Sequence, residues 1–388
     1  MGIRELDEQY IAHTYRRFPV EIVRGAGSEV FDSDGKRYID LGSGIAVTSF
    51  GVADPIWVRA VTDQLGKIQH MSNLYYTEPG ARLAEQLCLR TGMKKVFFSN
   101  SGAEANECAI KAARKRGAER HGKDCHLIVT LEHSFHGRTL TTLAATGQAH
   151  FHELYQPLTP GFVSVPAGDL DALRKLADSG RVAGVLAECI QGEGGVLPLP
   201  EGYLREVEKL AREKDFLLMV DEVQTGNGRT GKLYAYMHEG ITPDVVSTAK
   251  GLAGGLPLGA TMLGERAADV FGYGDHGSTF GGNPVCCAGA LSILNRIDDA
   301  LLLEVREKEK LLRRKLENRP GILEVTGRGL MLGIRTARPA GEIVAGCMEG
   351  GVLCLTAKDK VRLLPALNIP MELLEEGAEV IAREAARS

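Results

Sequence analysis

Short apolar runs alternate along the chain with longer stretches of helical periodicity, and this alternation limits the folds open to it. Four runs have the length and composition of strands buried on both faces: residues 95–99, 127–130, 182–187 and 216–220. Residues 103–120 and 201–214 carry helical patterns instead. Strands that alternate with helices predict an α/β fold in which a mostly parallel sheet lies between layers of helices.

A second, smaller domain is predicted from both ends of the chain. An Asp-Gly turn at Asp34 and Gly35 separates two strand-like segments, which is typical of a β-hairpin. From about residue 291 the pattern changes to a charged helix, hairpin strands and a final helix at 371–387. We expect residues 1–45 and 286–388 to form a small α+β domain beside a large domain of residues 46–285.

Composition and charge exclude several classes of protein. The 46 Lys and Arg residues against 50 Asp and Glu give a net charge of −4, so no basic excess is present to neutralise nucleic-acid phosphates. No apolar run approaches the ~18 residues that a membrane-spanning helix needs. The first eight residues are polar and acidic where a signal peptide would be apolar. We therefore expect a cytoplasmic protein that binds neither nucleic acid nor membranes.

Two short motifs suggest other chemistries, but each is incomplete. Residues 226–231 fit the glycine pattern of a dinucleotide site, and with Lys232 they nearly fit a phosphate loop, but Leu233 stands where that loop needs a hydroxyl. A nucleotide-binding switch or NTPase built on this loop is the alternative from another class. His133 and His136 lack a third ligand at suitable spacing, so we expect no metal site and an ordinary pair of loop histidines.

Three further segments place an anion site, a carboxylate and an amine at the ends of expected strands. Ser101 and Glu104 form a capping-box pattern, and Gly102 leaves the first N–H groups of that helix open to a phosphate, although the same pattern also suits a purely structural helix. Asp221 ends one apolar run, and Lys250 precedes a glycine-rich turn where desolvation would lower its pKa. Pyridoxal phosphate requires such a set: an anion site, a partner for its pyridinium nitrogen and a Schiff-base lysine.

The motifs around these residues resemble those of the class III pyridoxal-phosphate aminotransferases, in that family's order and over nearly the whole chain. They are SGAEANE at 101–107, FHGRT at 135–139, QGEGG at 191–195, DEVQTG at 221–226, KG at 250–251 and TFGGNP at 279–284. Within the class, SNLYYTEP at 72–79 and GKLYAY at 231–236 are most similar to the acetylornithine-specific branch, which serves arginine biosynthesis. The resemblance implies fold type I and transfer of the terminal amino group of N2-acetyl-L-ornithine to 2-oxoglutarate, giving N-acetyl-L-glutamate 5-semialdehyde and L-glutamate. Ornithine, succinylornithine and 4-aminobutyrate are the alternative amino donors.

The resemblance also implies how the cofactor is held. Lys250 forms the Schiff base and moves the proton, and Asp221 keeps the pyridinium nitrogen protonated. Phe135 and Val223 pack on the two ring faces, and Gln224 lies beside the ring hydroxyl. The implied cofactor-binding residues are Ser101, Gly102, Ala103, Phe135, Asp221, Val223, Gln224, Lys250 and Thr279.

The remaining implied roles concern the substrate and a second subunit. Thr279 is implied to reach the phosphate of the neighbouring subunit, which predicts a homodimer with the site at its interface. Arg138 and Ser278 are expected to hold the α-carboxylate of the substrate, and a planar bidentate donor such as arginine suits a carboxylate. Glu193 and Arg362 match a pair that forms a switchable salt bridge in related aminotransferases, so we expect Glu193 to neutralise Arg362 in one half-reaction and release it in the other.

Overall fold

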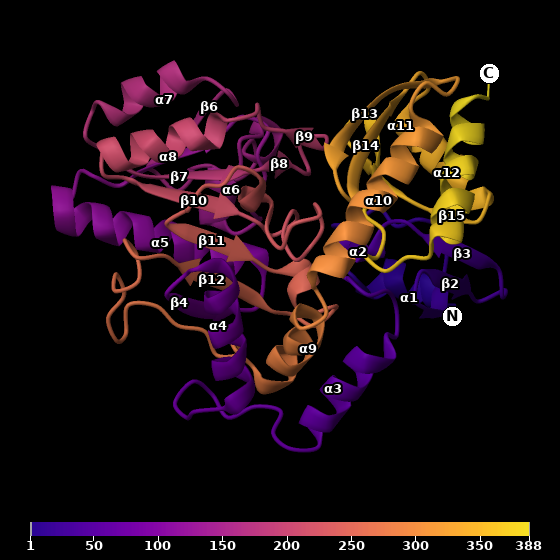
Figure 1. Ribbon diagram of the computed structural model, residues 1–388, viewed down its shortest axis with the longest axis horizontal. Coiled ribbons are helices and arrows are strands. Elements are labelled where there is room, and N and C mark those ends of the chain that lie inside the picture. The colour runs from indigo at the N-terminus through magenta and orange to yellow at the C-terminus, as the bar shows by residue number, and fades with distance from the viewer. Residues whose placement is uncertain (1, 388) are drawn as a thin grey trace.

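The computed structural model describes residues 2–387, and its centre is a seven-stranded sheet (Figure 1). The strand order is β4 (Lys95–Ser99), β12 (Gly259–Leu263), β11 (Val245–Thr248), β10 (Leu217–Asp221), β7 (Val182–Glu188), β5 (Leu127–Leu131) and β6 (Phe162–Val165). Strand β12 runs antiparallel to both of its neighbours, and the other neighbouring pairs are parallel. The predicted α/β fold with a mostly parallel sheet is confirmed.

Helices cover both faces of this sheet. Alternate residues of β10 show the division, because Leu217 and Met219 pack with α5 (Gly102–His121), whereas Leu218 and Val220 face the core that contains α8 (Tyr203–Glu213). The other helices of this part of the chain are α3 (Pro55–Leu65), α4 (Glu78–Thr91), α6 (Leu140–Ala145), α7 (Leu170–Ala177) and α9 (Pro284–Leu294). No helix among residues 2–387 is long and apolar enough to cross a membrane.

Two predictions about this sheet need correction. Strand β4 is not buried on both faces: it lies at the sheet edge, so Lys95 is exposed and residues 96–98 are half-buried. The capping box at α5 is half formed. The Ser101 hydroxyl accepts the Glu104 N–H at 3.2 Å, but the Glu104 carboxylate accepts the N–H of Asn100 instead of that of Ser101.

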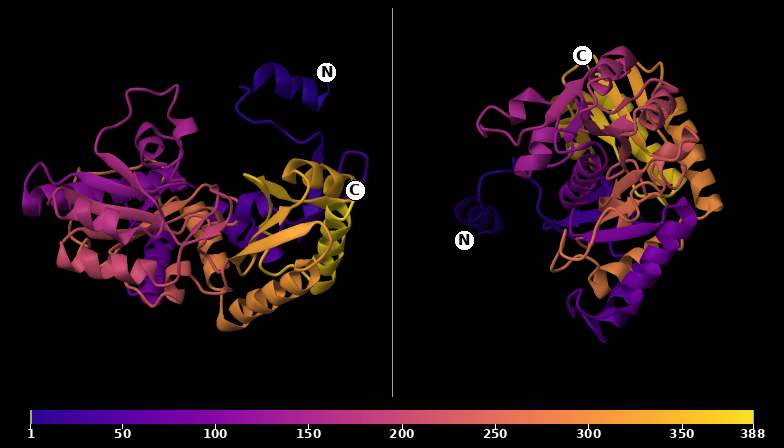
Figure 2. Two further views of the ribbon diagram at one scale, coloured as in Figure 1. Left: turned by 90° about the horizontal axis from the view of Figure 1, so that it is seen from above. Right: turned by 90° about the vertical axis from the view of Figure 1, so that its left-hand side faces the viewer.

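The N-terminal hairpin and the C-terminal part of the chain share a second body (Figure 1). One sheet orders β1 (Ile22–Ala26), β2 (Glu29–Asp32), β3 (Arg37–Asp40) and β15 (Val352–Leu353), and the other β13 (Ile322–Arg328), β14 (Met331–Thr336), β17 (Lys360–Leu363) and β16 (Leu355–Ala357). Their helices are α10 (Asp299–Leu316), α11 (Ala340–Glu349) and α12 (Met371–Ala385), and α1 (Ile3–Tyr10) stands away from the body (Figure 2). The domain limits near residues 45 and 285 stay predictions.

The glycine-rich loop at 226–231 has a structural role in place of the nucleotide-binding role considered above. The next helical element is the short 3-10 helix η2 (Ala235–His238), so no α-helix opens at the loop. Arg229 is 2% exposed, and its Nη1 donates to the carbonyl oxygens of Leu330, at 3.2 Å, and Pro365. Through Arg229, the loop that follows β10 is therefore hydrogen-bonded to the second body.

Asp215 anchors the C-terminal half of α5. Its carboxylate accepts from Arg116 at 2.7 Å, Arg120 at 2.8 Å and Arg266 at 2.8 Å. Partial burial opposes the charge of Asp215, but the three arginines outweigh burial and hold its pKa well below the usual range. The cluster fixes the direction of α5, whose other end points into the cavity described below.

We predict that Asp215→Asn lowers the free energy of unfolding at pH 7 by roughly 1–2 kcal/mol, after allowance for solvent screening. The folded-state pKa lies below the unfolded value of about 3.9, so the contribution is present above that value and is lost as the pH falls below it. Urea unfolding between pH 3 and 7 measures the difference, which should shrink below about pH 4. Asp124→Asn, at an exposed position, is the control. A difference that stays constant down to pH 3 would contradict the assignment.

Candidate active site

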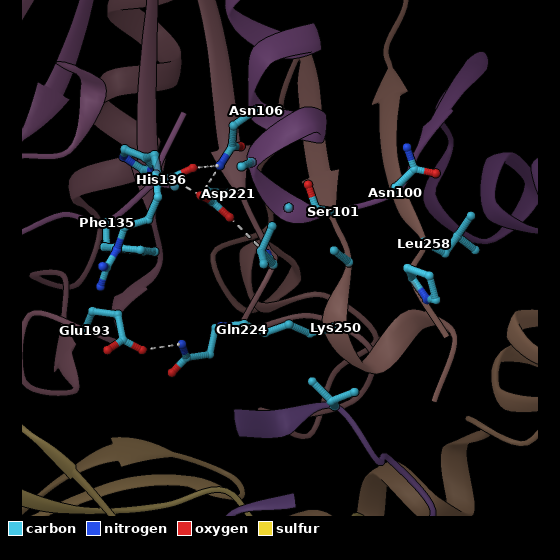
Figure 3. Close-up of a pocket in the computed structure, with 18 of the residues that line it drawn as sticks. Asn100, Ser101, Asn106, Phe135, His136, Glu193, Asp221, Gln224, Lys250 and Leu258 are labelled. Atoms are coloured by element: carbon cyan, nitrogen blue, oxygen red, sulfur yellow. Dashed lines mark hydrogen bonds and ion pairs between the residues drawn. The ribbon is translucent and has the colours of Figure 1, made fainter. Parts of the chain in front are cut away.

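A cavity of about 480 Å³ lies where β7, β10 and β11 end, at the crevice where α/β proteins bind ligands (Figure 3). The N-terminus of α5 and the loop at 135–138 complete its walls. Ten residues predicted from the sequence line it: Ser101, Gly102, Ala103, Phe135, Arg138, Glu193, Asp221, Val223, Gln224 and Lys250.

Strand register brings three polar side chains into one row at this edge. Asp221 of β10 lies opposite Glu188 of β7 on one side and Ser247 of β11 on the other. Glu188 accepts the N–H groups of Phe135, at 2.9 Å, and Gly192, at 3.1 Å, and so fixes two loops of the cavity. Burial raises the pKa of Glu188 to about 7, with the charge of His136 opposing the rise.

Asp221 is held by two residues whose roles the sequence did not reveal. Its Oδ2 accepts from Asn106 Nδ2 at 2.7 Å and lies 2.8 Å from Nδ1 of His136 (Figure 3). The prediction that His136 is an ordinary loop histidine is therefore wrong: the side chain is 2% exposed and orients Asp221. The Val223 N–H binds Oδ1 at 3.0 Å, so the carboxylate is fixed on both oxygens while it faces the cavity.

The N-terminus of α5 forms the anion-binding wall. The first N–H groups of a helix have no partner within it, and the helix dipole adds positive potential there. Gly102 is required by packing, because a Cβ at this position would lie 2.6 Å from Val223 Cγ1. Gly102 and Ala103 line the cavity at this end of the helix, where backbone N–H groups can bind a phosphate.

Lys250 enters the cavity from the turn after β11. Its φ of 45° lies in the left-handed region, which is strained for a residue with a side chain and is found most often at functional sites. Desolvation by burial lowers the pKa of Lys250, although the carboxylate of Glu193 opposes that shift. A lysine amine with a lowered pKa is a usable nucleophile.

Glu193, Gln224 and Arg362 form one polar triangle beside Lys250. Arg362 Nη1 donates to Glu193 Oε1 at 2.5 Å and to Gln224 Oε1 at 3.2 Å, and Gln224 Nε2 donates to Glu193 at 3.3 Å. Burial raises the pKa of Glu193, but the charge of Arg362 outweighs burial, so its net shift is downward. Glu193 and Arg362 thus meet as an ion pair, although 169 positions separate them in the sequence.

Ser278 and Thr279 do not line this cavity. They lie in a neighbouring pocket together with Lys111 and His276, and the Ser278 hydroxyl accepts from Asn100 Nδ2 at 3.2 Å. Arg138 does line the main cavity. The expectation that Arg138 and Ser278 act on one carboxylate is therefore not met within a single chain.

Comparison with known proteins identifies the family of the chain. The family model described as aminotransferase class-III matches residues 10–384. The acetylornithine aminotransferase of Haemophilus ducreyi is 48% identical, with 98% of each chain covered. The chain belongs to the class-III aminotransferases.

Solved structures show the same fold. An ornithine aminotransferase from Toxoplasma gondii, crystallised with partial occupancy of pyridoxal phosphate at its active site, superposes with a TM-score of 0.93 at 31% identity, covering 99% of this chain and 93% of that one. The N-acetylornithine aminotransferase of Stenotrophomonas maltophilia gives 0.84 at 36% identity, with 98% of each chain covered.

Pyridoxal phosphate is the cofactor of this chain, and the cavity has the donor set for it. The wall at Gly102 and Ala103 suits the phosphate, and the Asp221 carboxylate would supply the negative charge that a protonated pyridine nitrogen needs. Lys250 is the amine within the same cavity. No group of three or more His, Cys, Asp or Glu side chains among residues 2–387 could hold a metal ion.

We predict that Asp221→Asn keeps the fold and lowers the turnover rate by about ten- to a hundredfold. An amide cannot stabilise a positive nitrogen, and losing a charged hydrogen bond in a desolvated site costs roughly 1.5–3 kcal/mol. Turnover at saturating substrate and cofactor measures the loss, and circular dichroism checks the fold. Turnover close to that of the wild type would refute the assigned role.

Proposed function

We propose that the chain transfers the terminal amino group of N2-acetyl-L-ornithine to 2-oxoglutarate, as a homodimer. The observation that carries this proposal is the pair of arginines around the cavity, which differ in what holds them. Arg362 is 3% exposed and paired with Glu193, whereas Arg138 is exposed at the cavity wall. A site that binds two carboxylate-bearing substrates of different shape needs two arginines that can bind a carboxylate. One must always be accessible, and the other must become accessible for only one of the substrates.

The chemistry of the two substrates explains that need. Acetylornithine carries its carboxylate far from the amine that reacts, whereas glutamate carries one directly beside it. A free arginine near the reacting carbon would help glutamate and would draw the wrong end of acetylornithine towards Lys250. Glu193 masks Arg362 while acetylornithine reacts and releases it for glutamate or 2-oxoglutarate.

Arg362 can bind the carboxylate of a substrate as well as that of Glu193. Its Nε is buried without a hydrogen-bond partner among the described residues, so a donor remains free beside the pair. Glu193 is partly exposed and can swing away, because its side chain retains 32% of its accessible surface against 4% for Arg362. A substrate carboxylate would then replace that of Glu193.

The chain's own residues carry out the proton transfers around the cofactor, which supplies an aldehyde for the amino group and a ring that withdraws electrons. Lys250, desolvated in the cavity, accepts and returns the proton at the reacting carbon. Asp221 keeps a positive charge on the ring nitrogen, with His136 and Asn106 holding its carboxylate in place.

The homodimer is supported by residues of the neighbouring pocket and by exposed apolar side chains of the loop after α3. Ser278 and Thr279 line that pocket, and Leu74, Tyr75 and Tyr76 on the loop after α3 expose large apolar surface. In a dimer, Thr279 would reach the phosphate of the neighbouring subunit and Ser278 its substrate.

Steady-state comparison of the candidate donors tests the substrate. Acetylornithine should give a higher kcat/KM than ornithine, succinylornithine or 4-aminobutyrate with 2-oxoglutarate as acceptor. A clear preference for any of the other three would replace acetylornithine and leave the aminotransferase assignment unchanged.

We predict that Glu193→Ala leaves Arg362 permanently open. The half-reaction with glutamate should be retained or improved, and the selectivity for the terminal amine of acetylornithine should fall by at least tenfold, which corresponds to about 1.4 kcal/mol. Single-turnover kinetics of each half-reaction measure the two effects. Glu201→Ala, outside the cavity, is the control. Equal slowing of both half-reactions would remove support for the switch.

A further inference from the structure

Arg138 is positioned without any acidic partner. Among residues 2–387 its guanidinium makes no ion pair and no hydrogen bond. A long exposed side chain without such contacts samples many rotamers, and ordering it on binding a substrate costs free energy. A contact that orients the guanidinium before the substrate arrives would lower this cost.

Two aromatic rings contact the guanidinium instead. The Cζ of Arg138 lies 4.7 Å from the ring centroid of Phe151 and 5.7 Å from that of Phe135. The two rings meet edge to face, with centroids 5.9 Å apart and an interplanar angle of 65°. We call the two rings, Phe135 and Phe151, the aromatic bracket. Phe135 lines the cavity, so the aromatic bracket connects Arg138 to the cavity wall.

The segment that carries Phe151 is tethered on both sides. Phe151 ends the 3-10 helix η1 (Ala149–Phe151). On one side, the 5%-exposed Gln148 donates to the carbonyl oxygen of Ser134 at 3.1 Å, and on the other side His152 Nε2 lies 2.9 Å from the carbonyl oxygen of Leu143. These bonds fix the ring against the loop that carries Phe135 and Arg138.

We propose that Phe151 is the positioning residue that makes Arg138 a permanently open receptor for the distal carboxylate of the substrate, an inference that rests on the proposed function. An aromatic face attracts the guanidinium and leaves its N–H edge free to donate two hydrogen bonds. A carboxylate in the same place would occupy that edge, as Glu193 does at Arg362. The aromatic bracket thus orients the arginine without competing with the substrate.

A pair of donors that differ only in the carboxylate tests this proposal on the holoenzyme. N2-acetylornithine carries it, and N-acetyl-1,4-diaminobutane is the same molecule without it. In single-turnover experiments that follow the cofactor absorbance, Phe151→Leu should weaken apparent binding of acetylornithine by roughly 3- to 30-fold. Binding of the analogue and the limiting rate should stay within about twofold, and Phe151→Tyr should restore wild-type binding.

Tyr155→Leu is the matched control, because it removes an exposed aromatic ring from the same loop. Unchanged cofactor affinity in Phe151→Leu would show that the cavity is intact. Equal weakening with both donors, or no weakening with acetylornithine, would overturn the proposal. If the wild type prefers another donor, the proposed substrate fails, and the Phe151 comparison is made with that donor and its decarboxylated analogue.

Discussion

The site depends on the ion pair between the buried guanidinium of Arg362 and the carboxylate of Glu193. Removing one partner of a buried ion pair typically costs about 3–5 kcal/mol, because a charge is left without compensation. Glu193 therefore cannot simply leave: another carboxylate has to replace it. This exchange needs only a small free-energy difference, since one carboxylate is traded for another of similar strength. Under the proposed function, a substrate that brings a carboxylate to this position would open the pair, and a substrate that lacks one there would leave it closed.

The other acidic side chains of the cavity are each held by several hydrogen bonds. Asp221 is bound on both oxygens, by Asn106 and Val223 among others, and Glu188 ties two loops to the end of β7. Helix α5 is anchored through Asp215 at its far end. These fixed elements surround the position proposed for the cofactor, and under the proposed function the Glu193–Arg362 pair is the part that changes between the two half-reactions.

The sequence predicted the layers of the fold because apolar periodicity is a local signal. The sequence pattern predicted the bounds of α5, β7 and β10 to within two residues. It predicted β4 as buried on both faces, because the residues of a strand do not reveal whether it lies in the middle or at the edge of a sheet. Local reasoning also found Asp221 and Lys250, each at the end of a strand. It missed His136 and Asn106, whose contacts with Asp221 bridge 85 and 115 positions. The expected meeting of Glu193 and Arg362 rested on family resemblance and is confirmed by their contact.

Crystal structures of the Lys250→Ala enzyme, loaded with cofactor and with either N2-acetylornithine or glutamate, would show whether the Glu193–Arg362 pair opens for only one of the two substrates. The measured quantity is the distance between Arg362 Nη1 and the Glu193 carboxylate. We expect a closed ion pair with acetylornithine and an open one with glutamate, whose α-carboxylate takes the place of Glu193. Arg138 should keep its position against Phe151 in both complexes. The same closed pair in both complexes would contradict the proposed switch.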